Sequence, residues 1–295
     1  MSTITVADLQ LNVLQEGQGP DVVLIHGLGA NMAFWYPHIM MPLAKSFRVT
    51  AYDLRGHGNS SMPVSGYDTL AMSGDLVTVF DKCGISQAHL VGHSYGGGIA
   101  LHFALLHPER VLSLTLADAM VNALQPVVKL CDWPYWNDVL RDKFHQEGIS
   151  LPSENIELNA DLLEKLADPR WAQARNNLRK QGVYLPFGSW NKGKKSAKRF
   201  QHLLKHTTVG SQTKEVAGLT RESIEKINMA GLVIYGEYSM YLATMRALTE
   251  LLPSCQKVIV PQVAHFHPVI KPFFFLNALF DFFPSDKVTE IVTIQ

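Results

Sequence analysis

One serine stands between two glycines in the segment GHSYG, residues 92–96, directly after an apolar run. A nucleophilic serine must project its hydroxyl from a rigid scaffold, and a sharp strand-to-helix turn does this when the flanking residues are small. An apolar strand pattern precedes Ser94 and a helix pattern follows it. The segment therefore predicts that Ser94 is a nucleophile, with a chance glycine-rich turn as the alternative.

A neutral serine attacks poorly, so this chemistry needs further groups. A base must take the hydroxyl proton, and histidine has the suitable unperturbed pKa. An attacked ester carbonyl develops negative charge, which requires preorganised N–H donors. The chain contains 12 His, so the sequence offers several candidates for the base.

The elements around Ser94 alternate between strand and helix patterns. Residues 4–16 predict a strand or two, and short apolar runs predict strands over 21–27, 47–53, 87–93 and 111–119. Helix-like segments lie near 33–45, 69–82 and 95–107. This alternation is typical of a parallel sheet covered by helices on both faces.

The alternation stops after residue 119 and resumes near 229. Residues 120–228 carry helical spacing and no convincing central strand, whereas 231–237 and 256–262 again predict strands, with helices over 241–252 and 272–284. We therefore expect an α/β core made of 1–119 and 229–295, with a helical cap inserted at 120–228.

Three further motifs accompany the serine segment: HGLG at 26–29, DLRGHGNS at 53–60 and VAHFHP at 263–268. With these four motifs in this order, the chain resembles the α/β-hydrolase fold superfamily, as a serine-nucleophile member with a helical cap. The resemblance covers nearly all of the chain outside the middle insertion. It implies a mostly parallel central sheet flanked by helices.

The resemblance implies His265 as the catalytic base, because the family carries its base between the terminal strand and the last helix. His267 is the nearest rival, two residues further on. His93 is expected to pack beneath the serine turn, and His26 and His57 to act as hydrogen-bonded scaffold.

By the same family pattern, the backbone amides of Leu28 and Tyr95 form the oxyanion hole. The helix predicted to start near Tyr95 adds the positive end of its dipole. A plain tight turn is the alternative interpretation of the HGLG segment.

The catalytic acid departs from the family pattern. Related sequences read Gly-Glu-x-Asp after the strand at 231–237, but here Ser239 stands where that Asp is expected. Asp118 is the favoured replacement, since it lies at the end of the strand at 111–119 and some family members place their acid there. Glu237 is the second candidate, and a site without a charged acid is the third.

A serine at position 94 of this turn disfavours the alkyl-enzyme chemistry of haloalkane dehalogenases and epoxide hydrolases, which needs a carboxylate nucleophile. In the loop at 53–60, Asp53 and Arg55 are expected to be scaffold, through a local Asp–Arg or a backbone interaction. No HExxH motif, Cys/His ligand spacing or phosphate loop is present. We expect neither a metal nor a cofactor.

Aromatic residues in the cap, Trp133, Trp136 and Trp190, either wall an apolar pocket or simply pack the cap. Residues 191–206 contain six Lys/Arg and no Asp or Glu. This basic segment is either solvated surface or a docking site for an acidic carrier protein bearing a thioester.

Composition limits the other partners. The 295 residues include 26 Lys+Arg and 26 Asp+Glu, so the overall charge favours neither nucleic acid nor an anionic membrane. No secretory signal or transmembrane run stands out, and three widely spaced cysteines are typical of a reducing compartment. A cytoplasmic location is predicted.

These residues together predict a serine hydrolase of a small, hydrophobic ester or thioester. A cofactor-free, non-hydrolytic enzyme of the lyase type is one alternative, motivated by Ser239. A ligand-binding receptor with a vestigial site is the other.

Overall fold

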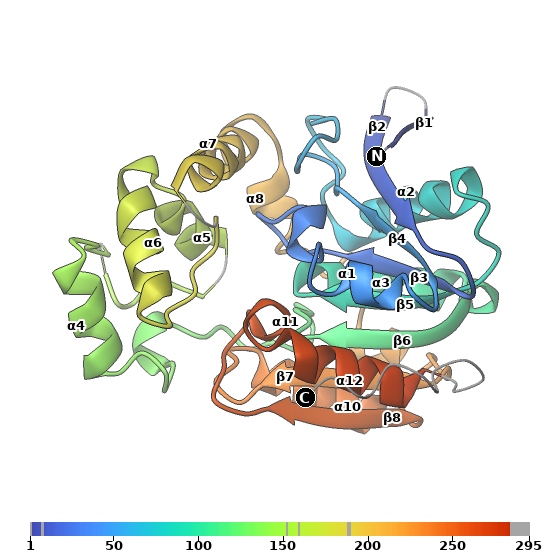
Figure 1. Ribbon diagram of the computed structural model, residues 1–295. Helices are drawn as coiled ribbons and strands as arrows, with labels where there is room; N and C mark the ends of the chain where they lie inside the picture. Colours follow the sequence, from blue (N-terminus) through green and yellow to red (C-terminus); the bar gives the residue numbers. More distant parts are fainter. Residues whose placement is uncertain (1, 7–8, 152, 159, 188–189, 284–295) are drawn as a thin grey trace.

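The computed structural model describes residues 2–6, 9–151, 153–158, 160–187 and 190–283. An eight-stranded sheet crosses the core in the order β1-β2-β4-β3-β5-β6-β7-β8 (Figure 1). The strands are β1 (Ser2–Val6), β2 (Leu9–Glu16), β3 (Asp21–Ile25), β4 (Arg48–Tyr52), β5 (Ala88–His93), β6 (Val111–Ala117), β7 (Gly231–Gly236) and β8 (Cys255–Val260).

Parallel pairing runs through the centre of the sheet. All strands from β4 to β8 along the sheet order pair in parallel, whereas β1 and β2 join antiparallel at one edge. Every residue of β5 and β7 is buried. This explains why these strands read as continuous apolar runs, since both faces of a central parallel strand are covered.

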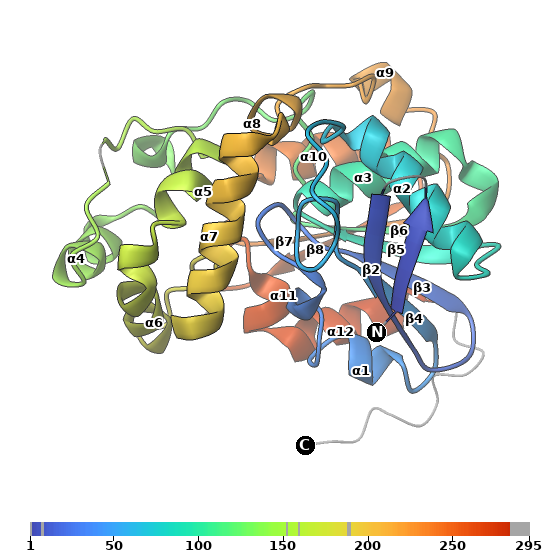
Figure 2. The same ribbon diagram turned by 90° about the horizontal axis from the view of Figure 1, so that it is seen from above.

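Helices cover both faces of the sheet (Figures 1 and 2). One buried cluster joins the sheet to α2 (Thr69–Lys82), α3 (Tyr95–Leu106) and α10 (Leu242–Leu251). A second cluster joins the other face to α1 (Met40–Leu43) and α12 (Pro272–Phe282), with the short α11 (His267–Ile270) before α12. The predicted mostly parallel sheet flanked by helices is confirmed.

One predicted helix is wrong. Residues 33–45 form a 3-10 turn at Met32–Phe34 and then, after an interval, the short α1. Pro37 lies in that interval, and proline has no N–H to continue a helical hydrogen-bond ladder. Elsewhere local signals were sufficient: Asp68 caps α2 by accepting from the N–H of Ala71 at 2.9 Å.

The segment between β6 and β7 is called the cap below. It contributes α4 (Asp138–Gln146), α5 (Ala160–Leu166), α6 (Ala172–Lys180), α7 (Trp190–His206), α8 (Val209–Gln212) and α9 (Arg221–Ile224). Helices α4 to α7 form a group beside the sheet, and α9 returns to the core (Figure 2). Among its described residues this segment adds no strand to the sheet. In the described part of the chain, no helix is long and apolar enough to span a bilayer.

Candidate active site

Ser94 occupies the turn between β5 and α3. Its backbone has φ 55 and ψ −124, a conformation that non-glycine residues rarely adopt and that costs on the order of 1–3 kcal/mol. A Cβ on Gly92 would lie 2.4 Å from the carbonyl oxygen of Gly96, and a Cβ on Gly96 would lie 2.4 Å from that of Ile25. Both flanking positions must therefore be glycine for this turn to form.

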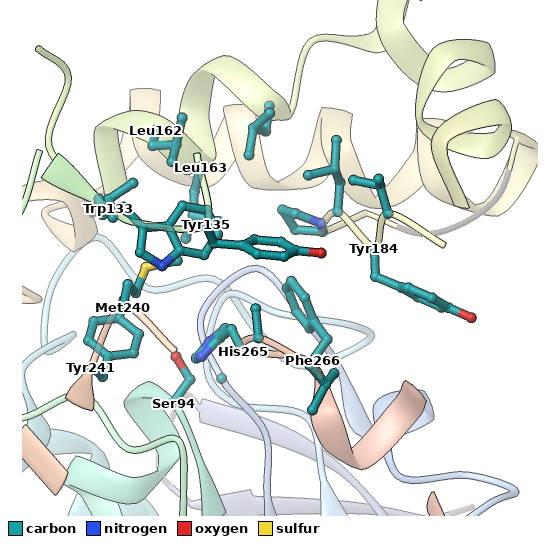
Figure 3. A pocket seen from close by; sticks show the side chains of 18 of the residues that line it. Ser94, Trp133, Tyr135, Leu162, Leu163, Tyr184, Met240, Tyr241, His265 and Phe266 are labelled. Atoms are coloured by element: carbon teal, nitrogen blue, oxygen red, sulfur yellow. The ribbon is translucent and has the colours of Figure 1, made fainter. Parts of the chain in front are cut away.

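His265 lies in the loop after β8, and its ring faces Ser94 (Figure 3). Its Nδ1 lies 3.1 Å from Oδ1 of Asp118. When Nδ1 donates to this carboxylate, Nε2 is left unprotonated on the opposite side of the ring, where it can accept a proton. The structure thus brings together three residues that stand far apart in the sequence.

Asp118 follows β6, has φ 47 and is fully buried. The N–H of Gly236 donates to its Oδ2 at 2.8 Å, and the hydroxyl of Ser239 donates to its Oδ1. A buried carboxylate is costly unless it is hydrogen-bonded, and donors favour its ionised form. Ser239, three residues after β7, therefore holds the carboxylate that follows the neighbouring strand β6.

Glu237 takes no part in this arrangement. Its side chain is exposed, and its Oε2 accepts the backbone N–H of Gln262 at 2.7 Å. Of the two candidate carboxylates, Asp118 is the one placed at His265.

His267 lies on the far side of Asp118, with Nε2 3.5 Å from Oδ2. The ring is fully buried and packs against Phe275. Burial lowers the pKa of His267 to about 4, although the nearby Asp118 opposes this shift. His267 is therefore a neutral neighbour of the acid.

His93 packs beneath the site, as predicted. Its ring lies between Phe34, with 4.5 Å between ring centroids, and His265, with 4.6 Å. Its Nε2 lies 2.9 Å from the carbonyl oxygen of His265. Burial, reinforced by the neighbouring His265, lowers the pKa of His93 well below its usual value. A neutral His93 can donate this hydrogen bond and hold the backbone of His265.

Two more histidines connect the HGLG segment to the loop at 53–60. Nε2 of His26 accepts the N–H of Leu54 at 3.0 Å, and Nε2 of His57 accepts the N–H of Gly29 at 3.0 Å. Burial lowers the pKa of His57 to about 3, which keeps its ring neutral and able to accept. Both residues are scaffold.

Tyr95 follows Ser94 directly in the chain, and Leu28 follows Gly27, which packs against Ser94. Tyr95 is the first residue of α3, so its N–H has no partner within the helix. A Cβ on Gly27 would lie 2.8 Å from Cβ of Ser94, so the HGLG segment packs directly on Ser94. Within the described residues neither N–H donates a hydrogen bond. Both N–H groups are therefore available as hydrogen-bond donors.

Ser94 and His265 line a cavity of about 170 Å³ between the core and the cap (Figure 3). Trp133 and Trp136 line it as well, and both also pack: the indole N–H of Trp133 donates to the carbonyl oxygen of Tyr238 at 2.9 Å, and the ring of Trp136 meets Phe144 edge-on. These two tryptophans therefore both line the apolar pocket and pack within the cap. The side chain of Trp190 lies outside the part of the chain that is described.

Asp53 and Arg55 do not pair with each other. Asp53 accepts the backbone N–H of Met32 at 2.8 Å and that of Asn59 at 2.9 Å, while Nε of Arg55 donates to Asp75 at 2.7 Å. Asp53 therefore joins two loops beneath the site through backbone contacts. Among the described residues, no three His, Cys, Asp or Glu side chains are placed to hold a metal ion.

A family model described as the alpha/beta hydrolase fold matches residues 20–272. The chain belongs to the α/β hydrolase fold family. The meta-cleavage product hydrolase of Pseudomonas fluorescens superimposes on it with a TM-score of 0.70 at 21% identity, covering 96% of this chain and 97% of the other. At that identity the likeness shows the fold alone.

Curated relatives match this α/β hydrolase over shorter stretches. A 2-hydroxymuconate semialdehyde hydrolase from a Pseudomonas species is 41% identical over 116 residues, 38% of this chain and 41% of the relative. A fluoroacetate dehalogenase from a Burkholderia species is 37% identical over 141 residues, 45% of this chain and 46% of the relative. The match thus spans less than half the length of each of these hydrolases.

Several contacts that support the site were not predicted from the sequence. The hydroxyl of Ser239 contacts Asp118. His267 lies beside the same carboxylate, and the N–H of Gly29 donates to His57. The sequence did contain one signal for the contact between Ser239 and Asp118: a serine stands after β7 where an acid was expected, and a candidate acid stands after β6.

Proposed function

We propose that this α/β hydrolase cleaves a small, hydrophobic ester or thioester through an acyl-enzyme on Ser94. One observation carries the proposal: the strained turn at Ser94 faces His265, whose Nδ1 lies 3.1 Å from the buried Asp118. Nucleophile, base and orienting acid then follow the chain order Ser, acid, His.

In the first half-reaction, Oγ of Ser94 attacks the carbonyl carbon and its proton passes to Nε2 of His265. The N–H groups of Leu28 and Tyr95 receive the negative charge on the carbonyl oxygen. Asp118 stabilises the imidazolium that forms. The imidazolium then protonates the leaving alcohol or thiol as the bond from the carbonyl carbon breaks.

In the second half-reaction, His265 takes a proton from water as the water oxygen attacks the acyl-enzyme. The same two N–H groups receive the charge again. Collapse of the tetrahedral intermediate returns the proton to Oγ of Ser94 and releases a carboxylic acid. One water is consumed in each turnover.

Ser94, at the turn between β5 and α3, argues against chemistry that needs a carboxylate nucleophile. The fluoroacetate dehalogenase among its relatives is named for cleavage of a carbon–halogen bond. Ser94 instead favours acyl transfer, as in ester hydrolysis. The contact between Asp118 and His265 supports hydrolysis over the lyase alternative, which was motivated by the absence of an acidic residue at position 239.

Docking of an acidic carrier protein at 191–206 stays a prediction. Lys195 and Lys198 are exposed on α7 and suit it, whereas Nη2 of Arg199 donates to the carbonyl oxygen of Ser60 at 2.6 Å. Arg199 therefore joins cap to core, and only part of the basic segment is free to meet a partner.

Turnover of p-nitrophenyl butyrate by the parent protein and by Ser94→Ala tests the proposal. We expect hydrolysis to fall by at least about 1,000-fold in the variant, because the nucleophile is removed. Mass spectrometry of the quenched parent reaction should find one added acyl group on the intact protein and, after digestion, on the peptide that carries Ser94. Equal turnover by Ser94→Ala would contradict the mechanism.

A further inference from the structure

The lining of the active-site cavity contains no formal charge on the cap side. Among the described residues that line the cavity, none is Lys, Arg, Asp or Glu. The cap contributes Trp133, Tyr135, Leu140, Phe144, Leu162 and Leu166. A charged group placed here would be desolvated without a partner.

The cavity also has depth beyond the reacting atoms. Figure 3 shows Ser94 and His265 at its base, Met240 and Tyr135 further from the base, and Leu162 on its opposite wall. The leucine comes from α5, and Leu140 and Phe144 come from α4. Space therefore extends from the nucleophile into the cap, between helices that are distant from the oxyanion site.

One buried cation of the cap, Arg175, is held by backbone carbonyls through one of its guanidinium nitrogens. Nη1 of Arg175 on α6 donates to the carbonyl oxygens of Leu166 at 2.7 Å and Asp168 at 2.9 Å, and the guanidinium does not line the cavity. Among the described residues that line the cavity, none therefore offers a counter-ion to a charged substrate group that points into the cap.

We propose that the cap side of the cavity is a subsite for an extended, uncharged hydrocarbon chain on the acyl group. The inference rests on the proposed function, because the chain must be joined to the carbonyl that Ser94 attacks. Each methylene buried in the subsite contributes about 0.8 kcal/mol, which is about fourfold in kcat/KM. A carboxylate at the end of the chain is excluded, since it would be buried unpaired.

The test uses p-nitrophenyl esters of acetate, butyrate, hexanoate and octanoate, together with the p-nitrophenyl monoester of suberic acid. We expect kcat/KM to rise about fourfold per methylene until the cavity is filled. The suberate monoester, which matches octanoate in length, should be at least about 100-fold poorer than octanoate.

Two neighbouring positions on α4 give a matched pair of variants. Leu140→Trp fills the subsite and should lower the octanoate-to-acetate ratio of kcat/KM by about tenfold or more. Val139→Trp adds the same side chain at a position that is 65% exposed and outside the cavity lining, and should leave that ratio unchanged. If Leu140→Trp does not fold, the ester series on the parent protein still decides the proposal.

Failure of this inference differs from failure of the proposed function. If no ester is hydrolysed, the function itself is wrong. If acetate is the best ester, or if the suberate monoester outcompetes octanoate, hydrolysis stands but the hydrocarbon subsite is overturned. A preference for suberate would point to Arg175, whose Nε and Nη2 are buried without a partner in the described part of the chain.

Discussion

Replacing Asp118 by Asn removes the charge that stabilises protonated His265 while keeping the shape of the side chain. With 3.1 Å between Oδ1 and Nδ1 and an effective dielectric constant of about 20, the lost interaction is about 5 kcal/mol. This corresponds to a fall in kcat of about 10,000-fold. Steady-state kinetics on p-nitrophenyl butyrate measures it, with KM expected to stay near the parent value.

Ser239 allows a stricter form of this test. Its hydroxyl contacts the same oxygen of Asp118 that His265 contacts. A carboxylate introduced by Ser239→Asp in the Asp118→Asn background should therefore reach His265 and recover at least about tenfold in kcat. Glu237→Gln is the matched control and should keep parent activity, because Glu237 contacts only the backbone of Gln262. A large loss in Glu237→Gln with little loss in Asp118→Asn would refute the assignment.

Three further outcomes are expected. Gly96→Ala should abolish activity and lower the unfolding temperature, since its Cβ would lie 2.4 Å from the carbonyl oxygen of Ile25; unchanged melting would contradict the close approach. Gly74→Ala, at an open position within α2, should raise the free energy of unfolding by about 0.5–1 kcal/mol in urea titrations and leave activity intact. Because burial holds the pKa of His57 at about 3 and of His267 at about 4, the unfolded chain binds more protons below pH 6.5. The free energy of unfolding should therefore decrease as the pH is lowered, by about 1.4 kcal/mol per histidine between pH 7.5 and 5.5. A profile that stays flat over this range would contradict the burial of these two histidines.

Local sequence was sufficient to predict much of the core. The strand before Ser94 and the helix after it follow from an apolar run, two glycines that only a tight turn requires, and a helical pattern. The helix predicted at 33–45 is interrupted in the structure, because Pro37 has no N–H to continue one hydrogen-bond ladder.

The surroundings of the acid could not be predicted in the same way. Spacing indicates that Asp118 and Ser239 each follow a strand, but it does not reveal that β6 and β7 are neighbours, which brings the two side chains into contact. The burial of His267 against Phe275 likewise depends on how α12 packs on the sheet. The cavity lining depends on α4, α5 and the loop after α6, and no single segment encodes how these three parts meet.

Labelling with a fluorophosphonate probe, located by peptide mass spectrometry, tests the central claim most directly, because the probe reacts only with a serine that a base has activated. We expect a single label on Ser94 in the parent protein, none on that peptide in Ser94→Ala and strongly slowed labelling in Asp118→Asn. Absence of label from Ser94 in folded parent protein, or labelling at another serine, would contradict the account.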